Sequence, residues 1–366
     1  MKILVVSNMY PSDKYPSYGT FVKTFCNQLS SLGIKYDISV MKKANSKPHK
    51  LINYFKFYSG TFFKCLFNNY DVVYVHYVSH SSLPVLAAKK IKKGINIFAN
   101  VHGSDVVPEN DKQEKMQKYT KETLEKSSRV IVPSNYFKEY VIKKYGLEDK
   151  KIKVYPSGGV NSQIFHPFTN LKKEELIKKL KLPLAPNLPT FGMVGRISFK
   201  KGWDTFLEAI NIVEEEGIKA NFLIVGDGPE KKKMVQMIKK LNLEDKIILM
   251  NSQSHQQLAY IYNLIDFFVF PTKREGESLG LVGIEALACG TPVIATDFAA
   301  PKYYIKNGYN GFKFSKENYK NLAKVIKNCA NLTEKEYINL VHNSIIAAEP
   351  YMSKNIELKL KQIIEN

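Results

Sequence analysis

Short apolar runs alternate with stretches of helical periodicity along most of the 366-residue chain. The first run, KILVVS at residues 2–7, predicts a buried parallel strand. After a loop rich in Pro, Ser and Tyr, apolar side chains at helical spacing predict a helix over residues 20–32, and residues 36–41 predict a second strand. This β-α-β start is typical of a doubly wound α/β fold, in which ligands bind beyond the carboxyl ends of the strands. It contains no G-x-G-x-x-G, so a dinucleotide cofactor is not expected.

The same alternation continues toward the C-terminus, with one interruption. Residues 170–189 hold a Lys-rich helix and then a segment with three prolines, a composition typical of an interdomain connection. The α/β pattern restarts with a predicted strand at residues 191–194. A chain of this length suits two cores better than one. We therefore expect two Rossmann-like doubly wound domains, at residues 1–168 and 169–349, and a final helix within residues 350–366 that crosses back to the first domain.

Composition narrows the class of protein. A hydrophobic fraction of 44% with 24% charged residues is ordinary for a globular chain. No apolar run reaches the roughly 18–20 residues of a membrane span, and the N-terminal residues predict a strand rather than a signal peptide. The four cysteines are widely separated and form neither a Cys-x-x-Cys pair nor a zinc spacing. Free thiols in the cytoplasm are therefore expected.

Charge is the unusual feature of the composition. Residues 1–170 contain 26 Lys and Arg against 12 Asp and Glu, which gives +14 of the total +20. A basic half suggests an anionic partner such as a membrane surface, a lipid-linked phosphate or nucleic acid, whereas the alternative is a solvated Lys-rich surface. Within it, LINYFKFYSGTFFKCLF at residues 51–67 carries seven Phe or Tyr. This stretch predicts either a basic aromatic face on an anionic membrane or a helix whose aromatics pack inward.

Two groups of polar residues follow predicted strands. His102, in HGSD, comes directly after the apolar run at residues 95–101. Arg196 and Lys201, in GRISFKKG, lie five positions apart after the strand at residues 191–194, so two cations can reach one site and neutralise a departing diphosphate. The sequence contains no Asp-x-Asp motif for a divalent ion, and we therefore expect metal-independent chemistry with no cofactor.

The stretch DFFVFPTKREGESLGLVGIEALACGTPVIAT, residues 266–296, combines two carboxylates with a helix start. Glu277 lies near the beginning of the predicted helix and Glu285 eight positions later, inside an otherwise apolar run. A helix start offers backbone N–H groups to a phosphate, and carboxylates can accept hydrogen bonds from sugar hydroxyls. A carboxylate in an apolar run requires a polar partner, so we expect one for Glu285. The turn GDGP at residues 226–229 permits close approach of a ligand, although such turns are common.

Taken in order, these motifs resemble family 4 of the retaining glycosyltransferases, which have the GT-B fold of two Rossmann-like domains facing across a cleft. The Glu-x7-Glu signature of that family matches Glu277 and Glu285, and its G-R-x4-K element matches Arg196 and Lys201. Gly19 matches the glycine loop of the first β-α turn, and His102 matches the histidine on the acceptor side. The segments at residues 132–137, 156–160 and 225–229 also match.

The resemblance implies roles for individual residues. Glu285 would bind ribose hydroxyls, Glu277 the transferred sugar, Arg196 and Lys201 the leaving nucleoside diphosphate, and His102 would lie near the sugar and the acceptor. The backbone at the helix start would bind the diphosphate, and the GDGP turn would lie near the nucleoside. The implied catalytic residues are His102, Glu277, Arg196 and Lys201. The implied donor-binding residues are Gly19, Arg196, Lys201, Gly226, Asp227, Gly228, Glu277, Ser278, Leu279, Gly280, Leu281 and Glu285.

The resemblance also implies the substrates. The donor would be a nucleotide sugar, UDP- or GDP-linked, and the acceptor a glycan or a polyprenyl-linked glycan of a bacterial capsule, O-antigen or exopolysaccharide. An enzyme at the inner face of the membrane would fit the basic first half. The alternatives are a UDP-sugar 2-epimerase of the same fold and a basic nucleic-acid-binding protein. The chain departs from many members in having Ala299-Ala300 where they have two glycines, Tyr303 where they have Glu, and Tyr18 or Thr20 where they have a second N-terminal glycine.

Overall fold

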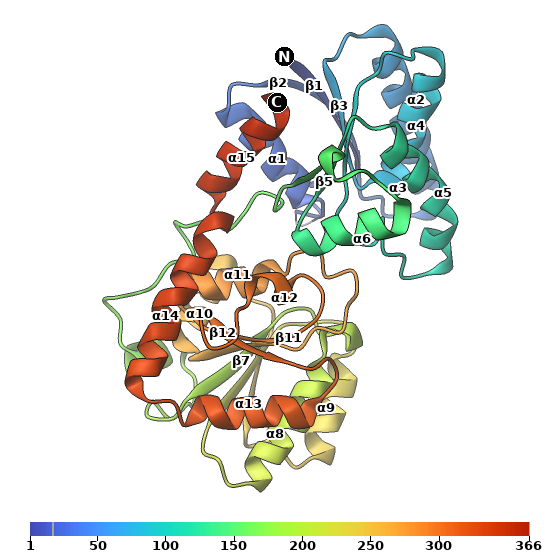
Figure 1. Ribbon diagram of the computed structural model, residues 1–366. Coiled ribbons are helices and arrows are strands. Elements are labelled where there is room, and N and C mark those ends of the chain that lie inside the picture. Colours follow the sequence, from blue (N-terminus) through green and yellow to red (C-terminus); the bar gives the residue numbers. More distant parts are fainter. Residues whose placement is uncertain (17, 366) are drawn as a thin grey trace. The chain divides into compact units, whose positions relative to one another are not determined.

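The computed structural model describes residues 1–16 and 18–365 (Figure 1). The chain forms two compact units, one of residues 1–158 together with the C-terminal residues from Ile356, and one of Gly159–Asn355. Each unit is a parallel sheet of six strands with helices on both of its faces. This is the doubly wound α/β architecture that the alternating sequence pattern predicts.

The sheet of the first unit has the strand order β2-β1-β3-β4-β5-β6. Its strands are β1 Lys2–Tyr10, β2 Lys35–Lys42, β3 Val72–His76, β4 Ile97–Asn100, β5 Arg129–Val132 and β6 Ile152–Val154. Its helices are α1 Thr20–Ser31, α2 Lys47–Phe67, α3 Val78–Ser81, α4 Leu83–Ile91, α5 Asp111–Lys126, α6 Asn135–Tyr145, a 3₁₀ turn at Asp149–Lys151, and α15 Ser353–Glu365.

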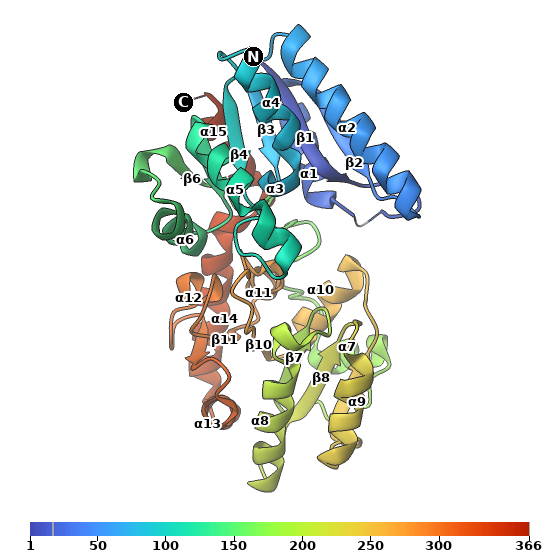
Figure 2. The ribbon, with the colours of Figure 1, turned by 90° about the vertical axis from the view of Figure 1, so that its right-hand side faces the viewer.

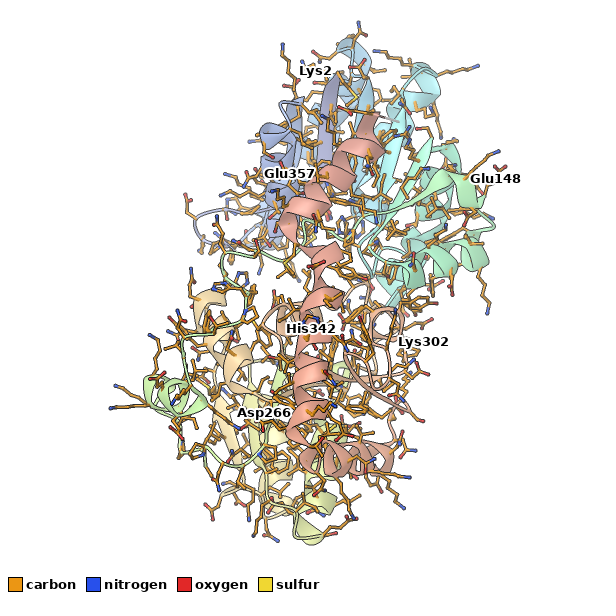
Figure 3. All side chains as sticks on the ribbon, turned by 60° about the vertical axis from the view of Figure 1, so that its left-hand side comes forward. Lys2, Glu148, Asp266, Lys302, His342 and Glu357 are labelled. Carbon is orange, nitrogen blue, oxygen red and sulfur yellow. The ribbon has the colours of Figure 1, made fainter. Side chains whose placement is uncertain are left out.

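Alternate side chains of β1 enter two different cores, as the two-residue period of a strand requires. Ile3 and Val5 pack with side chains of α1 and α15, whereas Leu4 and Val6 pack on the side covered by α2, α4 and α6. The C-terminal helix therefore contributes to the first core, as expected. Its side chains in that core are Ile356, Leu360, Ile363 and Ile364. Glu357 of the same helix also accepts a hydrogen bond from Ser31 of α1 (Figure 3).

The sheet of the second unit has the order β12-β11-β10-β7-β8-β9 (Figure 2). Its strands are β7 Thr190–Val194, β8 Asn221–Val225, β9 Ile247–Met250, β10 Phe267–Phe270, β11 Val293–Thr296 and β12 Gly311–Phe314. Its helices are α7 Lys173–Leu180, α8 Trp203–Glu215, α9 Lys231–Lys240, α10 His255–Leu264, α11 Leu281–Ala288, α12 Pro301–Tyr304, α13 Tyr319–Ala330 and α14 Glu334–Ala348, with 3₁₀ turns at Phe199–Lys201 and Glu349–Tyr351.

The segment at residues 170–189, predicted to connect two domains, lies within the second unit. Leu176 of α7 and Leu184 pack with Leu264 of α10 in a small core of their own. Asp266, which precedes β10, accepts hydrogen bonds from Lys173 Nζ at 2.5 Å and from the backbone N–H of Thr190 at 2.7 Å (Figure 3). The proline-rich composition thus belongs to a packed extension of the second unit, and the two units divide between residues 158 and 159.

Each sheet has one point at which the chain reverses its direction of strand addition. In the first unit β1 lies between β2 and β3, and in the second unit β7 lies between β8 and β10. The loops at the carboxyl ends of these strands diverge there and leave a crevice suited to a ligand. Gly19 and His76 follow or end the strands at the first switch point, and Arg196 and Glu277 follow those at the second. The topology therefore brings Gly19, Arg196 and Glu277, which the sequence predicts as site residues, to these two edges, together with His76, which it does not.

Candidate functional site

The loop after β7 carries the two predicted cations of the second unit. Arg196 is exposed, and within residues 1–16 and 18–365 its side chain has no hydrogen-bonding or ion-pair partner. Lys201 ends a 3₁₀ turn, and its Nζ lies 2.5 Å from Oε2 of Glu277 and 5.7 Å from the ring centroid of Phe270. One cation is therefore available to an incoming anion, whereas the other is already held by a carboxylate.

Glu277 is buried in the loop after β10, with a side chain that is 8% exposed. Besides Lys201, its Oε2 accepts a hydrogen bond from Thr272 Oγ1 at 3.2 Å, and its backbone N–H donates to Arg274 O. Burial alone would raise the pKa of Glu277, but Lys201, assisted by Arg274 and Thr272, more than offsets this and lowers it. Glu277 is thus an ionised carboxylate at neutral pH, with a fixed orientation.

Gly280 begins α11 with a backbone that only glycine can adopt without strain. Its φ is +75°, and a Cβ built there would lie 2.6 Å from the ring of Phe270. The first N–H groups of a helix have no acceptor within the helix itself, so they are available to an anion. The turn at Gly280 follows the loop that carries Glu277, and α11 begins at the next residue. Ser278 and Leu279 precede Gly280 in the loop, and Leu281 is the first residue of α11.

Glu285 lies on α11 and has the polar partner that its apolar surroundings demand. The hydroxyl of Tyr262, on α10, lies 3.3 Å from its Oε2. Burial raises the pKa of Glu285 to about 7, and the hydrogen bond from Tyr262 reduces this increase only in part. Near neutral pH, Glu285 therefore exists as a mixture of protonated and ionised forms.

The raised pKa of Glu285 predicts a pH dependence of stability. The folded chain retains a proton between the ordinary glutamate pKa of 4.5 and about 7 that the unfolded chain releases, so the free energy of unfolding should fall as the pH rises through this window. Glu285→Gln removes this titration. We expect the stability of the variant, relative to the wild type, to increase from about pH 5 to about pH 8. Urea unfolding at several pH values measures this, and parallel curves for the two proteins would contradict it.

The loop after β8 approaches the Arg196 loop closely. The backbone N–H of Ile197 donates to Asp227 O at 2.9 Å, and a Cβ added to Gly228 would lie 2.2 Å from Ile197 O. A larger residue than glycine would separate the two loops. On the outer side, Asp227, Gly228 and residues of α9 line an open pocket of about 620 Å³. Gly226 also lies on this loop, so the predicted GDGP turn adjoins the loop that carries Arg196.

His102 follows β4 in the first unit and is held by the carboxylate of Asp105. Oδ1 of Asp105 accepts the backbone N–H groups of His102 at 3.0 Å and Gly103 at 2.8 Å, and Oδ2 accepts that of Val78 at 3.3 Å. Burial raises the pKa of Asp105 to about 6 although these N–H groups oppose the change. The aspartate three residues after His102 is therefore a structural anchor of the loop.

The side chain of His102 contacts a second histidine that the sequence-based interpretation did not assign. His76 Nδ1 lies 3.0 Å from His102 Nε2, and the ring of Phe21 lies against His102 with centroids 4.3 Å apart. Burial lowers the pKa of both imidazoles, and the pair lowers that of His76 further, so both are neutral near pH 7. His76 Nε2 is buried without a partner among the described residues. The hydrogen bond therefore fixes the orientation of His102 and couples its tautomer to that of His76.

This pairing predicts the effect of substituting His76. His76→Phe removes the partner of His102 Nε2, and we expect the kcat of the chain's reaction to fall about 10- to 100-fold because His102 loses its orientation. His76→Asn, whose amide replaces the nearer ring nitrogen, should recover most of the rate. The substrate KM should change little in both variants. Steady-state kinetics with thermal unfolding as a folding control tests this, and equal rates for Phe and Asn would contradict a positioning role.

Two of these partners were missed from the sequence for one reason. His76 and Tyr262 contact His102 and Glu285 from another strand or helix, so nothing near the motifs indicates them, whereas Thr272 lies in the same loop as Glu277. His76 ends β3, directly after the apolar residues VVYV, and this position at the end of an apolar run was the available signal. Gly19 lies where expected: its φ is +76°, and a Cβ there would lie 2.6 Å from the Met9 backbone.

The structure shows how Ala299 is accommodated where many members of the resembled family have glycine. Ala299 has a φ of 53°, in the left-handed region where glycine is favoured, and it is buried. The next residue, Ala300, donates its backbone N–H to Glu277 O at 3.3 Å. The chain therefore keeps the turn that a glycine would allow, at a cost of about 1–2 kcal/mol for the alanine. Across residues 1–16 and 18–365, no cluster of three or more His, Cys, Asp or Glu is arranged to hold a metal ion.

Comparison with known families agrees with this geometry. A family profile described as Glycosyl transferases group 1 matches residues 172–343, and one described as Glycosyltransferase Family 4 matches residues 19–159. The chain belongs to glycosyltransferase family 4. The two profiles cover the switch-point loops of both units, including His102 in the first and the Arg196 and Glu277 loops in the second.

Individual relatives of this family 4 chain are distant. The N-acetyl-alpha-D-glucosaminyl L-malate synthase of Bacillus anthracis is 28% identical over 67% of this chain and 61% of its own length. TuaC of Bacillus subtilis, a teichuronic acid biosynthesis glycosyltransferase by name, is 26% identical over 81% of both chains. The chain spans less than two thirds of the length of several curated relatives that it matches: five of them are aligned over 31% to 66% of their own lengths. HepE of Anabaena, solved with UDP, has the same fold, with a TM-score of 0.75 and 17% identity over 100% of this chain and 99% of its own.

Proposed function

We propose that the chain is a retaining glycosyltransferase that moves a sugar from a nucleotide-diphosphate sugar to a glycan or lipid-linked glycan. The observation that carries this proposal is the cluster at the switch point of the second unit, where the Lys201–Glu277 pair, exposed Arg196 and the start of α11 all follow the adjacent strands β7 and β10. This cluster combines cations and helix N–H groups with a fixed carboxylate, which suits a diphosphate bonded to a sugar.

The proposed chemistry assigns a step to each group. The C1–O bond to the diphosphate breaks as a bond forms between C1 and the acceptor oxygen on the same face of the sugar. Arg196 and Lys201 stabilise the negative charge that develops on the departing diphosphate. A phosphate oxygen takes the proton of the acceptor hydroxyl. Glu277 accepts hydrogen bonds from the sugar, Glu285 accepts them from the ribose, and neutral His102 contacts the sugar without acting as a cation.

The nature of the substrates is also a proposal. HepE was solved with UDP, which favours a uridine nucleotide. Relatives named for capsular polysaccharide and teichuronic acid biosynthesis favour a bacterial surface polysaccharide as the product. We infer that the reaction needs no divalent metal, because Arg196 and Lys201 supply the positive charge at the diphosphate. We place the enzyme in the cytoplasm, peripherally on an anionic membrane, because the first half is strongly basic.

The test is transfer from a panel of UDP- and GDP-sugars to isolated polysaccharide and polyprenyl-linked acceptors, in EDTA. We expect one donor to give a product whose anomeric configuration, read from the NMR coupling of the anomeric proton, equals that of the donor. An inverted product would contradict retention. An epimerised donor formed without acceptor would assign the chain to the epimerases instead, and loss of activity in EDTA would contradict metal independence.

A further inference from the structure

Helix α2 covers one side of the first unit with only part of its surface. It runs beside β2 and α4 at the edge of the sheet (Figure 2). Its buried side chains are Phe57, Thr61 and Cys65, and Tyr54, Tyr58, Phe62 and Leu66 pack partly against the same core. The expectation that the aromatics pack inward is thus correct for one face of the helix.

The opposite face of α2 carries large apolar side chains in water. Leu51, Phe55, Phe63 and Phe67 are 75%, 74%, 53% and 78% exposed. These positions, with Ser59 between them, recur every four residues, so they form one stripe along about 24 Å of helix. Ile52, 50% exposed, widens the stripe at its start. Helices of globular proteins normally place polar residues on this face.

The charge around this stripe has only one sign. Residues 38–70 contain six Lys and no Asp or Glu. Lys47, Lys50 and Lys56 are exposed on α2 itself, whereas Lys64 donates to Ile38 O. Because the 21 residues of α2 include no Asp or Glu, its lysines cannot form the ion pairs within the helix that usually balance such charges.

The end of α4 extends the same surface. Lys92 Nζ donates to Asn68 O at 2.9 Å and to Leu66 O at 3.4 Å, which ties the end of α4 to the end of α2. Beside this contact, Ile91 is 68% exposed, and Lys90 and Lys93 are exposed. We call the exposed apolar and Lys side chains of α2 and the end of α4 the α2 surface.

We propose that the α2 surface docks on an anionic phospholipid bilayer, with the apolar stripe in the headgroup region and the lysines against lipid phosphates. An amphipathic helix with a basic polar part and aromatic or leucine side chains on the other part lies in such an interface. None of the helices in the described chain is both long and apolar enough to cross a membrane. Docking would hold the first unit at the surface where a lipid-linked acceptor resides.

Other occupants fit the observations less well. A second copy of the chain would place the lysines of both α2 surfaces against one another, and this like-charge contact opposes association. A nucleic acid or another soluble polyanion would bind the lysines, but it offers no apolar phase to Leu51, Phe55, Phe63 and Phe67. An anionic bilayer accommodates both the charge and the apolar stripe.

Both the lysines and the apolar stripe of the α2 surface should contribute to lipid binding. Each lysine near an anionic surface strengthens binding by about fivefold at physiological salt, so three together contribute about a hundredfold. This part weakens as salt screens the surface. The apolar stripe supplies the part that salt does not remove. The inference deepens the proposed peripheral location but does not depend on the transferase assignment, since vesicle binding and sugar transfer are measured separately.

The experiment is flotation of the full chain with vesicles of phosphatidylcholine alone and of phosphatidylcholine mixed with phosphatidylglycerol. The variants are Phe55→Ser/Phe63→Ser/Phe67→Ser for the stripe and Lys47→Gln/Lys50→Gln/Lys56→Gln for the charge. The matched control is Ile338→Ser/Leu358→Ser, whose apolar side chains are 55% and 56% exposed on α14 and α15. Circular dichroism verifies folding, and light scattering without lipid measures self-association.

We expect the wild type and the control to float with the anionic vesicles only. The charge variant should bind about a hundredfold more weakly and the stripe variant at least tenfold more weakly, with transfer to a water-soluble acceptor unchanged. Equal binding by the stripe variant and the wild type would overturn the proposal in favour of a simple polyanion site. Lipid-free dimers that the stripe variant abolishes would overturn it in favour of a second copy.

If sugar transfer is absent but flotation follows this pattern, only the proposed function fails. If transfer is present and the wild type does not float, only the docking proposal fails.

Discussion

Arg196→Ala should lower kcat for sugar transfer by about 10²–10³-fold, with no change in the melting temperature. The side chain is exposed and has no partner in the part of the chain that the structure describes, so its removal leaves no buried group unpaired. Arg196 should contact the diphosphate of the bound donor and contribute most as further negative charge develops there, whereas it has no partner in the free chain, so kcat rather than the stability of the free chain should respond. Steady-state kinetics and thermal unfolding measure the two quantities.

Lys324→Ala is the matched control for Arg196→Ala. Lys324 is an exposed cation on α13, so its substitution changes the net charge equally. We expect wild-type rates and stability for this variant. An Arg196→Ala enzyme with full activity would contradict the proposed role, and one that melts far below the control would show that Arg196 has a structural role instead.

Lys201→Met should reduce both activity and stability. Glu277 is buried beside Lys201, and removal of one partner from a buried ion pair typically costs about 3–5 kcal/mol because it leaves the other charge uncompensated. Glu277→Gln in the same chain removes that charge. We therefore expect the double variant to be more stable than Lys201→Met alone, although both are inactive. Urea unfolding of the wild type, both single variants and the double variant gives the coupling energy.

Two outcomes would contradict this account of the pair. If the two substitutions acted additively on the free energy of unfolding, Lys201 and Glu277 would not interact as their 2.5 Å contact indicates. If Lys201→Met were as stable as Arg196→Ala, the buried carboxylate would have another compensating partner. Together, the Arg196 and Lys201 variants separate a cation reserved for the ligand from one that also stabilises the fold.

The sequence predicts most of the architecture because buried parallel strands and amphipathic helices have distinct periods. The strand at residues 2–7 and the helix at residues 20–32 agree with β1 and α1 apart from their ends. The prediction for residues 170–189 was wrong, because proline content resembles that of a linker even where the segment packs. Leu176 and Leu184 bury their side chains against α10, and this requires knowledge of the tertiary partner.

The sequence predicts the motifs of the candidate site, but it does not predict which side chains of these motifs contact one another. Lys201 and Glu277 belong to separate motifs 76 residues apart, and only the order of β7 and β10 in the sheet brings them to 2.5 Å. The apolar run around Glu285 indicates that this carboxylate needs a polar partner, but it does not identify Tyr262 on the neighbouring helix. The pairing of His76 with His102 likewise depends on β3 and β4 being adjacent strands.

We propose above that Arg196, Lys201, Glu277 and Glu285 bind a nucleotide sugar without metal. The most direct measurement is the shift in melting temperature that UDP- and GDP-sugars produce in EDTA, for the wild type, Arg196→Ala, Glu285→Ala and Lys324→Ala. We predict that one nucleotide sugar stabilises the wild type and Lys324→Ala equally, and that both site variants lose most of the shift. Undiminished shifts in Arg196→Ala and Glu285→Ala would contradict the claim.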